Sequence, residues 1–398
     1  MFLGFGEVMM RVAPDQKLRL RQVLPGRVEV TWGGGEANVC ASLAMYGQQA
    51  RYVSALPDNA LTASLIASLR GLGVDTSQIL HRDGRLGIYF VEVGANQRGS
   101  TVLYDRSHSS VSLAGPEEYD WETILQDVHW LHVSGITPAV SRAACESNLA
   151  LVQRAKERGV TVSCDLNFRK KLWKWDDELT GIDLARKCMA DVLPYVDLVI
   201  GNEEDAEDML DIRASETDVH AGTINAMAYE DVARQIVDRY SNVNRVAITL
   251  RESISADHNN WGAMLFDVAT DKSYFAPIDE NGEYKSYRIG HIVDRVGGGD
   301  SFAAGLLHAL NTPKFQDPAT AIDYAVAASC LKHSIKGDFN YIEQHEVEAL
   351  MSGSASGRVP VSYTHLRAHE TLRSVVWRVG VGKKKRGGGV GGGGGGGG

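Results

Sequence analysis

Three glycines followed by an aspartate form the part of the chain that is best suited to chemistry. Residues 294–302 read Asp-Arg-Val-Gly-Gly-Gly-Asp-Ser-Phe, and an apolar helical pattern follows. Gly297, Gly298 and Gly299 let the backbone approach a ligand closely, and N–H groups at a helix start favour phosphate or developing negative charge. Asp300, at the mouth of this site, could accept the proton of a hydroxyl that attacks a phosphoryl group. The alternative is a glycine turn in which Asp300 only caps the helix.

A second glycine cluster also opens a helix, much earlier in the chain. Residues 33–38 read Gly-Gly-Gly-Glu-Ala-Asn. Close backbone approach at Gly34 and the side-chain amide of Asn38 suit hydrogen bonds to sugar hydroxyls. No Gly-Lys-Ser/Thr follows, so the cluster is not a Walker loop, and the third glycine of a dinucleotide fingerprint is missing. Taken alone, these residues favour a plain turn.

The elements that must hold these residues alternate between strand and helix. The expected strands are 3–6, 50–55, 130–134, 160–166, 196–200 and 246–250, and the expected helices are 37–46, 61–70, 144–158 and 303–310, with another helix ending at 240. Such alternation is typical of a parallel sheet with helices on both faces. The sequence therefore predicts a doubly wound α/β sandwich.

Two segments break this alternation. Residues 11–30 and 87–106 alternate large apolar with polar side chains, which is the period of a half-buried strand. We expect them to form one small antiparallel β sheet inserted as a lid in the main α/β domain, which then comprises residues 1–10, 31–86 and 107–359. The alternative is that the two segments are edge hairpins of the main sheet.

Composition limits the classes of protein to which this chain can belong. Its 398 residues are 44% hydrophobic and 23% charged, as expected of a globular protein with a sizeable core. A formal charge of −9 argues against a nucleic-acid partner, and the lack of a long apolar run argues against a membrane span. The chain starts without a secretory signal, and its five cysteines contain no CxxC pair, so we expect a cytoplasmic protein with reduced thiols.

The last part of the chain, residues 360–398, does not continue the α/β pattern. Residues 363–371 read Tyr-Thr-His-Leu-Arg-Ala-His-Glu-Thr, which resembles translated sequencing-adapter sequence, and a basic run and eight glycines follow. A segment of this composition cannot bury a core, so we expect it to be disordered and treat it as an artefact. The alternative, a basic tail that binds a partner, has less support.

Taken together, the two glycine clusters and their order in the chain resemble the motifs of a known protein family. The chain resembles the ribokinase-like (PfkB) carbohydrate kinases, which pair an early two-glycine motif with a late Asp-x-x-Gly-x-Gly-Asp motif. The match extends over residues 1–359, although Arg295 and Gly298 stand where threonine and alanine are commoner. Within the family it most resembles the 2-keto-3-deoxygluconate kinases, on residues 6–9, 102–106, 165–169 and 332–340.

The resemblance implies roles for particular side chains. Asp300 matches the family's catalytic base, and Gly297, Gly298 and Gly299 match its anion hole. The positions that match substrate contacts are Gly34, Asn38, Tyr89, Tyr104, Arg106 and Arg169. An arginine fork suits the carboxylate of a ketoacid. The alternatives are a surface ion pair for Arg106, with Asp105 or another acid, and ordinary sheet packing for the two tyrosines.

The resemblance also implies a nucleotide and a metal ion. Thr249 and Arg251 lie where the family's nucleotide loop begins, although the usual glycine-bearing loop is replaced by Ser-Ile-Ser. Asn202 and Asp205 resemble the family's Asn-x-x-Glu motif, which organises Mg²⁺ and phosphate through water. Asp205 is one methylene shorter than glutamate, so Glu203 or Glu204 could serve instead. The alternative is an acidic helix start that the helix dipole favours.

The expected activity is ATP-dependent and Mg²⁺-dependent phosphorylation of 2-keto-3-deoxygluconate to its 6-phosphate, with Asp300 as the base. Three alternatives stay open: a kinase for another sugar such as fructose, a sugar-binding regulator that has lost catalysis, and a nucleoside kinase of the same fold, whose uncharged substrate would not need Arg106 and Arg169. The exposed face of the lid suggests a homo-oligomer.

Overall fold

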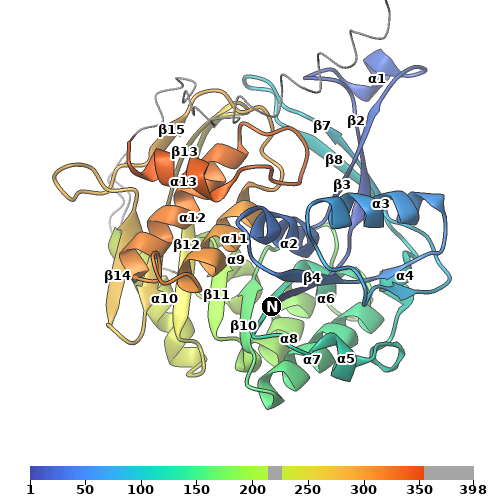
Figure 1. Ribbon diagram of the computed structural model, residues 1–398, viewed down its shortest axis with the longest axis horizontal. Helices are drawn as coiled ribbons and strands as arrows, with labels where there is room; N and C mark the ends of the chain where they lie inside the picture. The colour runs from blue at the N-terminus through green and yellow to red at the C-terminus, as the bar shows by residue number, and fades with distance from the viewer. Residues whose placement is uncertain (214–225, 354–398) are drawn as a thin grey trace, which may run out of the picture. The chain divides into compact units, whose positions relative to one another are not determined.

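A computed structural model describes residues 1–213 and 226–353 of the chain (Figure 1). These residues lie in one compact unit, Met1–Ser354. The tail expected to be disordered, residues 360–398, lies outside the described residues.

Among the described residues, nine strands form the main sheet, which has β1 and β9–β12 at its centre. The strands are β1 (Phe2–Phe5), β4 (Ala50–Val53), β9 (Trp130–Ser134), β10 (Thr161–Asp165), β11 (Leu198–Gly201), β12 (Arg245–Ser255), β13 (His258–Asp267), β14 (Lys272–Ala276) and β15 (Tyr287–Ile289). The order is β14-β13-β12-β11-β10-β9-β1-β4, with β15 also paired to β13. All neighbours from β4 to β12 run parallel, which confirms the doubly wound α/β prediction.

The antiparallel extension of this sheet was not predicted. β12 turns back into β13, and β13 pairs antiparallel with both β14 and β15. The predicted end of the strand at Leu250 is therefore wrong, because β12 continues to Ser255 as one arm of this hairpin.

Helices cover both faces of the main sheet, because successive strand residues point to opposite sides. In β11, Leu198 and Ile200 join one buried cluster while Val199 joins the other. The first cluster lies under α2 (Gly35–Met45), α3 (Ala60–Gly71), α11 (Gly298–Leu310), α12 (Pro318–Lys332) and α13 (Gln344–Met351). The second lies under α4 (Ser110–Leu113), α5 (Trp121–Ile124), α6 (Ile136–Val140), α7 (Arg142–Glu157), α8 (Gly181–Val192), α9 (Glu203–Leu210) and α10 (Ala226–Arg239). Figure 1 shows α2 beside α11 and α12, so the two glycine-led helices share one face.

The two segments that break the alternation form a separate sheet, which we call the lid sheet. Its strands, in order, are β3 (Glu29–Gly33), β2 (Met9–Ala13), β7 (Ile88–Glu92) and β8 (Thr101–Asp105). This arrangement supports an inserted sheet over two edge hairpins of the main sheet. The sheet is mixed, however, since its central pair, β2 and β7, runs parallel and only the two outer pairs run antiparallel. A wholly antiparallel lid is therefore wrong in this detail: β2 and β7 come from distant segments, so no hairpin fixes their relative direction.

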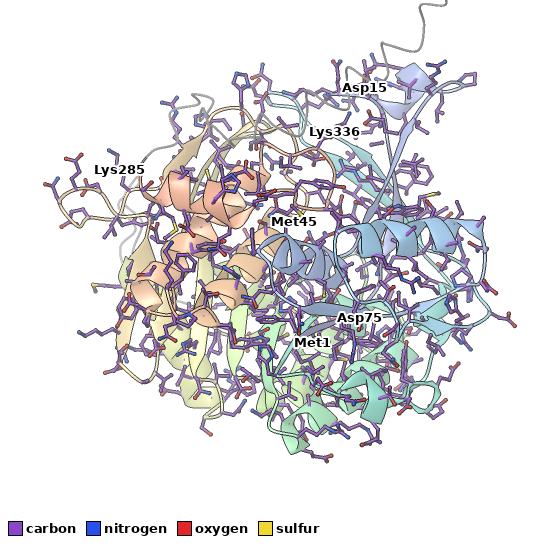
Figure 2. The ribbon with its side chains drawn as sticks, viewed as in Figure 1. Met1, Asp15, Met45, Asp75, Lys285 and Lys336 are labelled. Carbon is purple, nitrogen blue, oxygen red and sulfur yellow. The ribbon has the colours of Figure 1, made fainter. Side chains whose placement is uncertain are left out.

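The lid sheet has one covered and one exposed face. Met9, Ala13, Tyr89 and Val91 form a small buried cluster on the covered face. Leu103, on the other face of β8, is 64% exposed. Figure 2 shows Asp15 of the segment between β2 and β3 near Lys336, to which it is paired at 3.1 Å.

The remaining elements are short: α1 (Leu20–Val23), β5 (Ala55–Leu56), β6 (Leu80–His81) and two 3-10 turns at Pro116–Glu118 and Leu193–Tyr195. Within the described ranges, no helix combines the length and apolar character needed to cross a bilayer.

Candidate active site

A cavity of about 500 Å³ is lined by the lid sheet, the start of α11 and the carboxyl ends of β10, β11 and their neighbours. Ligands of open α/β sheets bind at this end of the strands. The structure brings all the residues that were predicted for the catalytic, substrate, nucleotide and metal sites to this one cavity. They are Gly34, Asn38, Tyr89, Tyr104, Arg106, Arg169, Asn202, Asp205, Thr249, Arg251, Gly297, Gly298, Gly299 and Asp300. The structure thus shows that these residues lie together, whereas the role of each one stays a prediction.

The late glycine run forms a tight entry into α11. Gly297 has φ 82° and ψ 0°, the left-handed conformation that glycine adopts without strain. A Cβ added there would lie 2.4 Å from the carbonyl oxygen of Asp338. A Cβ on Gly298 would press on the His333 ring, whereas one on Gly299 would meet nothing within 4 Å. The glycines of the run thus serve different purposes. Gly297 permits the left-handed backbone and the close packing against Asp338, whereas Gly299 leaves its backbone N–H open to a ligand in the cavity.

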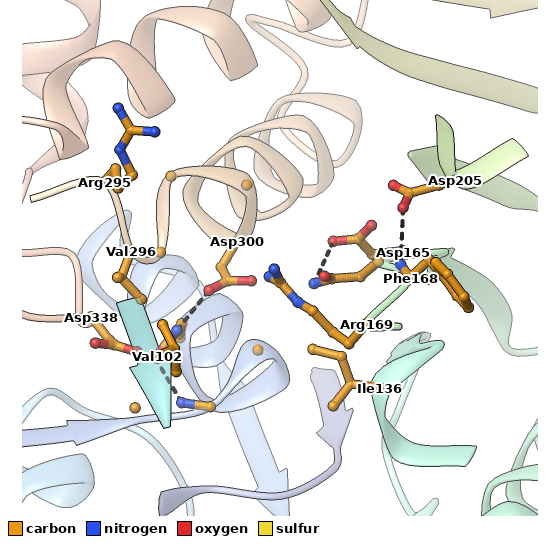
Figure 3. A pocket seen from close by; sticks show the side chains of 18 of the residues that line it. Val102, Ile136, Asp165, Phe168, Arg169, Asp205, Arg295, Val296, Asp300 and Asp338 are labelled. Atoms are coloured by element: carbon orange, nitrogen blue, oxygen red, sulfur yellow. Dashed lines mark hydrogen bonds between the residues drawn. The ribbon is translucent and has the colours of Figure 1, made fainter. Parts of the chain in front are cut away.

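Asp300 is held by the side chain of Asn38. The Nδ2 of Asn38 donates a 2.6 Å hydrogen bond to Oδ2 of Asp300, as Figure 3 shows. The orientation of the amide is fixed because its Oδ1 accepts from the backbone N–H of Gly34 at 3.2 Å. Asn38 is 2% exposed and sits in the first turn of α2. The two glycine clusters therefore meet through one hydrogen bond, which gives Asn38 a positioning role that the sequence did not suggest.

The carboxyl group of Asp300 has a perturbed acidity. Burial raises the pKa of Asp300 to about 6, and the charge of Asp338 acts in the same direction. The hydrogen bond from Asn38 and the positive charges of Arg169 and Lys332 oppose this rise in pKa. A carboxylate with a pKa nearer neutrality is a stronger base than an ordinary aspartate and is still ionised at pH 7.

Arg169 reaches into a group of carboxylates. Figure 3 shows its side chain extending between Asp300 and Asp165. Asp165 ends β10 and is 9% exposed. Burial, together with the charges of Asp205 and Asp300, holds the pKa of Asp165 well above its usual range, and Arg169 partly offsets this effect. Asp165 was missed as a site residue, although its place at the end of a buried strand was a usable signal.

Asn202 and Asp205 form a reciprocal cap at the start of α9. The Oδ1 of Asn202 accepts from the N–H of Asp205 at 2.8 Å, and the N–H of Asn202 donates to Oδ2 of Asp205 at 3.3 Å. The other Asp205 oxygen accepts from the N–H of Phe168 at 2.9 Å. Burial raises the pKa of Asp205 to about 6. These contacts support the helix-cap alternative, and within the described ranges no three acidic, histidine or cysteine side chains group as metal ligands.

The lid residues already have partners inside the protein. Tyr89 donates its hydroxyl to Oδ1 of Asp338 at 2.6 Å. Arg106 is 9% exposed, is paired with Glu7, and lies 5.5 Å from the centre of the Tyr104 ring. The alternative of an ion pair between Arg106 and an acid other than Asp105 is therefore supported, although the pair with Glu7 is buried and not on the surface. Asp105 as the partner is wrong, because Asp105 pairs with Arg85.

A buried charge network that the sequence did not reveal ties the lid sheet to the glycine loop, residues 294–297, which leads into α11. Arg11, on β2, donates to Asp294 at 2.5 Å and to Asp338 at 2.7 Å. Asp294 also accepts from the N–H groups of Val296 and Gly337, each at 3.1 Å. No local spacing links these positions, so only the fold could show that they meet.

The side of the cavity next to β12 holds Thr249 and Arg251. The hydroxyl of Thr249 donates to the carbonyl of Gly201 at 3.4 Å, and Arg251 stands opposite Trp261 in the β12–β13 hairpin. Arg295, which precedes the late glycine run, donates to the carbonyl of Ala256 at the tip of this hairpin, at 2.6 Å. Thr249 and Arg251, which were predicted to contact a nucleotide, thus lie on strand β12 and not in a loop, and Arg295 joins the tip of the β12–β13 hairpin to the segment before α11.

Comparisons with known proteins agree with this geometry. The 2-dehydro-3-deoxygalactonokinase of Haloferax volcanii is 30% identical over 353 residues, which cover 89% of this chain and 97% of that protein. The crystal structure of 2-dehydro-3-deoxygluconokinase from Thermotoga maritima matches with a TM-score of 0.79 and 42% identity, over 88% of this chain and 99% of that chain. A sugar kinase from Pyrococcus horikoshii, solved in complex with ATP, shares the fold at 18% identity, with a TM-score of 0.65 over 87% of this chain and 96% of that one.

The model of the pfkB family of carbohydrate kinases matches residues 3–231. This match spans more than half of the chain, and it confirms the family expected from the two glycine clusters. The chain belongs to the pfkB family of carbohydrate kinases.

Proposed function

We propose that the protein transfers the γ-phosphoryl group of ATP to the 6-hydroxyl of 2-keto-3-deoxygluconate (2-dehydro-3-deoxygluconate) and of its galactonate epimer. One observation carries this proposal: Asp300, at the glycine-led start of α11, shares its cavity with Arg106 and Arg169. A base, an anion site and two guanidinium groups suit phosphoryl transfer to an acidic sugar. The names of the Haloferax and Thermotoga relatives support the same substrate class.

Asp300 acts on the substrate hydroxyl. As the hydroxyl oxygen bonds to the γ-phosphorus, the bond from that phosphorus to the ADP oxygen breaks, and Asp300 takes the hydroxyl proton. Asn38 keeps the carboxylate oriented for this transfer. The N–H groups at Gly297–Gly299 and the α11 dipole offset the charge on the transferring group.

The arginines distinguish an acidic substrate from a neutral one. Arg169 is exposed to the cavity, so its guanidinium can bind the substrate carboxylate without first leaving a buried partner. Arg106 is buried and paired with Glu7, so it presents a more fixed charge on the lid side. A neutral sugar such as fructose has no carboxylate for Arg106 and Arg169 to bind. Phosphorylation of a neutral sugar is therefore the second candidate function.

The nucleotide and its metal ion are assigned to the other end of the cavity. Thr249 and Arg251 lie beside Gly201 and Trp261, where the ATP would extend from β12 towards the glycine run. Mg²⁺ binds ATP phosphates with several waters and needs only one or two carboxylates. Glu203 and Glu204 of the α9 start would supply oxygen ligands that fit this mode, while Asn202 and Asp205 hold that helix start in place. The ion would neutralise charge on the phosphates.

The lid sheet has two proposed uses. Its covered face carries Tyr89 and Tyr104 into the cavity, so closure over a bound sugar would exclude water and limit ATP hydrolysis. Its other face exposes Leu103 and Val30 and could pair with a second copy of the chain. Light scattering of the purified protein, compared with a Leu103→Lys variant, tests the oligomer. All five cysteines are free, in keeping with the expected cytoplasmic location.

The experiment compares ATP-dependent phosphorylation of 2-keto-3-deoxygluconate, 2-keto-3-deoxygalactonate, fructose and ribose, with product mass and ³¹P coupling to locate the phosphate. We expect 6-phosphorylated ketoacids and no product from Asp300→Asn. Arg169→Lys should weaken the ketoacid selectively, since lysine lacks the bidentate fork. Products from fructose or ribose alone would overturn the ketoacid assignment. Sugar binding without any turnover would favour the non-catalytic regulator.

A further inference from the structure

Lys332, the last residue of α12, is a completely buried cation directly behind the glycine run. It is 0% exposed, and its Cε would lie 3.2 Å from a Cβ placed on Gly297. From the sequence, a lysine at the end of a helix suggests a solvated side chain that interacts with the helix dipole. Burying an ammonium group costs several kcal/mol unless its protons are all bound, so its position needs an explanation.

Three backbone carbonyl groups surround the ammonium group. The Nζ of Lys332 donates to Gly337 at 2.8 Å, to Val296 at 2.9 Å and to Ile335 at 3.2 Å. An ammonium group has three protons, and each can be assigned to one of these oxygens. Burial lowers the pKa of Lys332, and the charges of the nearby carboxylates of Asp294 and Asp338 oppose this effect. Lys332 is therefore a cation in a cage of carbonyl oxygens.

This cage contains the peptide group that leads into the anion site. The carbonyl of Val296 and the N–H of Gly297 belong to one peptide unit, and in a trans peptide they point in opposite directions. By binding the carbonyl, Lys332 directs the N–H of Gly297 away from itself. Lys332 also binds the carbonyl of Gly337, and the next residue in the chain is Asp338. The carbonyl oxygen of Asp338 packs so closely against Gly297 that a Cβ added there would lie 2.4 Å from it.

We propose that Lys332 is a positioning residue for phosphoryl transfer: a built-in monovalent cation that fixes the glycine turn and adds positive charge behind the anion site. A small set of backbone carbonyls is also the coordination that a potassium ion accepts. Here the cation is covalently attached to the chain, so it cannot dissociate. The catalytic rate should then be insensitive to the monovalent cation in the buffer. This inference rests on the proposed kinase function.

The first test needs no variant. The wild-type rate is measured in sodium, potassium, ammonium and tetramethylammonium chloride at equal ionic strength. We expect the four rates to agree within about twofold, whereas a cation required in the site would change a rate by about tenfold or more. A strong requirement for potassium would overturn the proposal.

The second test removes the cation and then replaces it. Lys332→Met keeps most of the side-chain length, and Lys332→Ala leaves room for a small ion. Both should lower kcat by about tenfold or more, with a smaller change in the KM of the sugar. Ammonium or methylammonium ions should restore part of the Lys332→Ala rate and none of the Lys332→Met rate. Lys336→Met is the matched control, because Lys336 is an exposed lysine four residues further along the chain, beyond the end of α12, and is paired with Asp15 and Glu29.

A binding measurement separates failure of this inference from failure of the proposed function. ADP with aluminium fluoride mimics a phosphoryl group in transfer and needs no sugar turnover. Calorimetry should show weaker binding of this complex, by about tenfold, to folded Lys332→Met, and unchanged binding of ADP alone. If ADP with aluminium fluoride binds equally well to the wild type and to Lys332→Met, the proposed role of Lys332 is wrong. If the wild type phosphorylates no sugar, the proposed function fails, and the same binding result still decides the inference. If both variants fail to fold, the salt series on the wild type decides it.

Discussion

Asn38 and Asp300 are separated by 262 residues in the chain, yet the amide of one donates a 2.6 Å hydrogen bond to the carboxylate of the other. Each side chain stands in the first turn of a helix that a glycine cluster opens, and α2 and α11 pack on the same face of the sheet. The hydrogen bond therefore connects the early glycine cluster, through Asn38, with the late glycine cluster, through Asp300. It also makes the environment of Asp300 depend on a residue of another helix, α2.

Replacing Asn38 should therefore act through Asp300. Asn38→Ala removes the hydrogen bond that favours the ionised form, and Asn38→Asp adds a second negative charge. Both should lower kcat and move the acidic limb of the pH–rate profile upwards, with the larger shift for Asn38→Asp. The measurement is kcat against pH between 5 and 9. Ser42→Ala, one turn further along α2, is the control and should keep the wild-type profile; an unmoved limb in both Asn38 variants would contradict the positioning role.

The raised pKa of Asp300 makes opposite predictions for activity and stability. Because this pKa is about 6, activity should fall as the pH drops through 6 and the base becomes protonated. The folded-state pKa lies above the unfolded value near 4, so folding favours the protonated form. The resulting stability is fully present below pH 4 and is lost as the pH rises through 6.

Asp300→Asn tests the stability half of this argument. The amide mimics the protonated acid and carries no charge at any pH, so the variant should be inactive but melt at a higher temperature than the wild type at pH 8. The difference should shrink towards pH 4. Thermal unfolding across this pH range measures it. A variant that is less stable than the wild type at pH 8 would show that the Asp300 carboxylate is stabilising, which contradicts the pKa shift.

The fold was largely predictable because its signals are local. β9 was predicted with the bounds the structure has, and α2 and α11 were both found, since the apolar period acts over a few positions. Their predicted starts were too late, by two residues in α2 and by five in α11, because the glycines that open each helix also form its first turn. The direction of β2 against β7 and the β12–β13 extension were not predictable in this way. Each depends on which distant segment supplies the pairing partner.

The site was predictable in its membership and less so in its contacts. All the chosen residues line one cavity, because the family pattern marks positions. The pattern does not say what each side chain touches: Tyr89 binds Asp338, and Arg106 pairs with Glu7. The burial of Lys332 was also not predictable from the sequence, since a lysine at a helix end normally reaches solvent. Only the surrounding backbone carbonyls explain its position.

Two alanine substitutions in the glycine run should differ sharply in stability. Gly297→Ala must accommodate a left-handed φ of 82° and a Cβ 2.4 Å from the Asp338 carbonyl oxygen. We expect it to cost about 2 kcal/mol of unfolding free energy or more, from backbone strain and displacement of Asp338. Gly299→Ala places its methyl group in open space and should change stability by less than about 0.5 kcal/mol. Urea unfolding of both variants measures the contrast, and equal losses would contradict it.

The lid sheet should depend on Arg11 for its attachment. Arg11 is 2% exposed, and Arg11→Met would remove the buried guanidinium that is paired directly with Asp294 and Asp338. Removing one partner of a buried ion pair costs about 3–5 kcal/mol, so a large fall in unfolding free energy is expected. Arg19→Met, in the segment that follows β2, breaks only a half-exposed pair with Glu92 and should cost less than about 1 kcal/mol.

The same pair of variants separates stability from lid function. Asp338 also accepts from Tyr89, so loss of Arg11 would release a tyrosine that lines the sugar side of the cavity. Folded Arg11→Met, assayed well below its melting temperature, should therefore show a raised KM for the sugar acid and little change in the KM for ATP. If both KM values rise together, the network supports the whole cavity and not the lid in particular. Arg19→Met should leave both values at the wild-type level, because its pair lies outside the cavity lining.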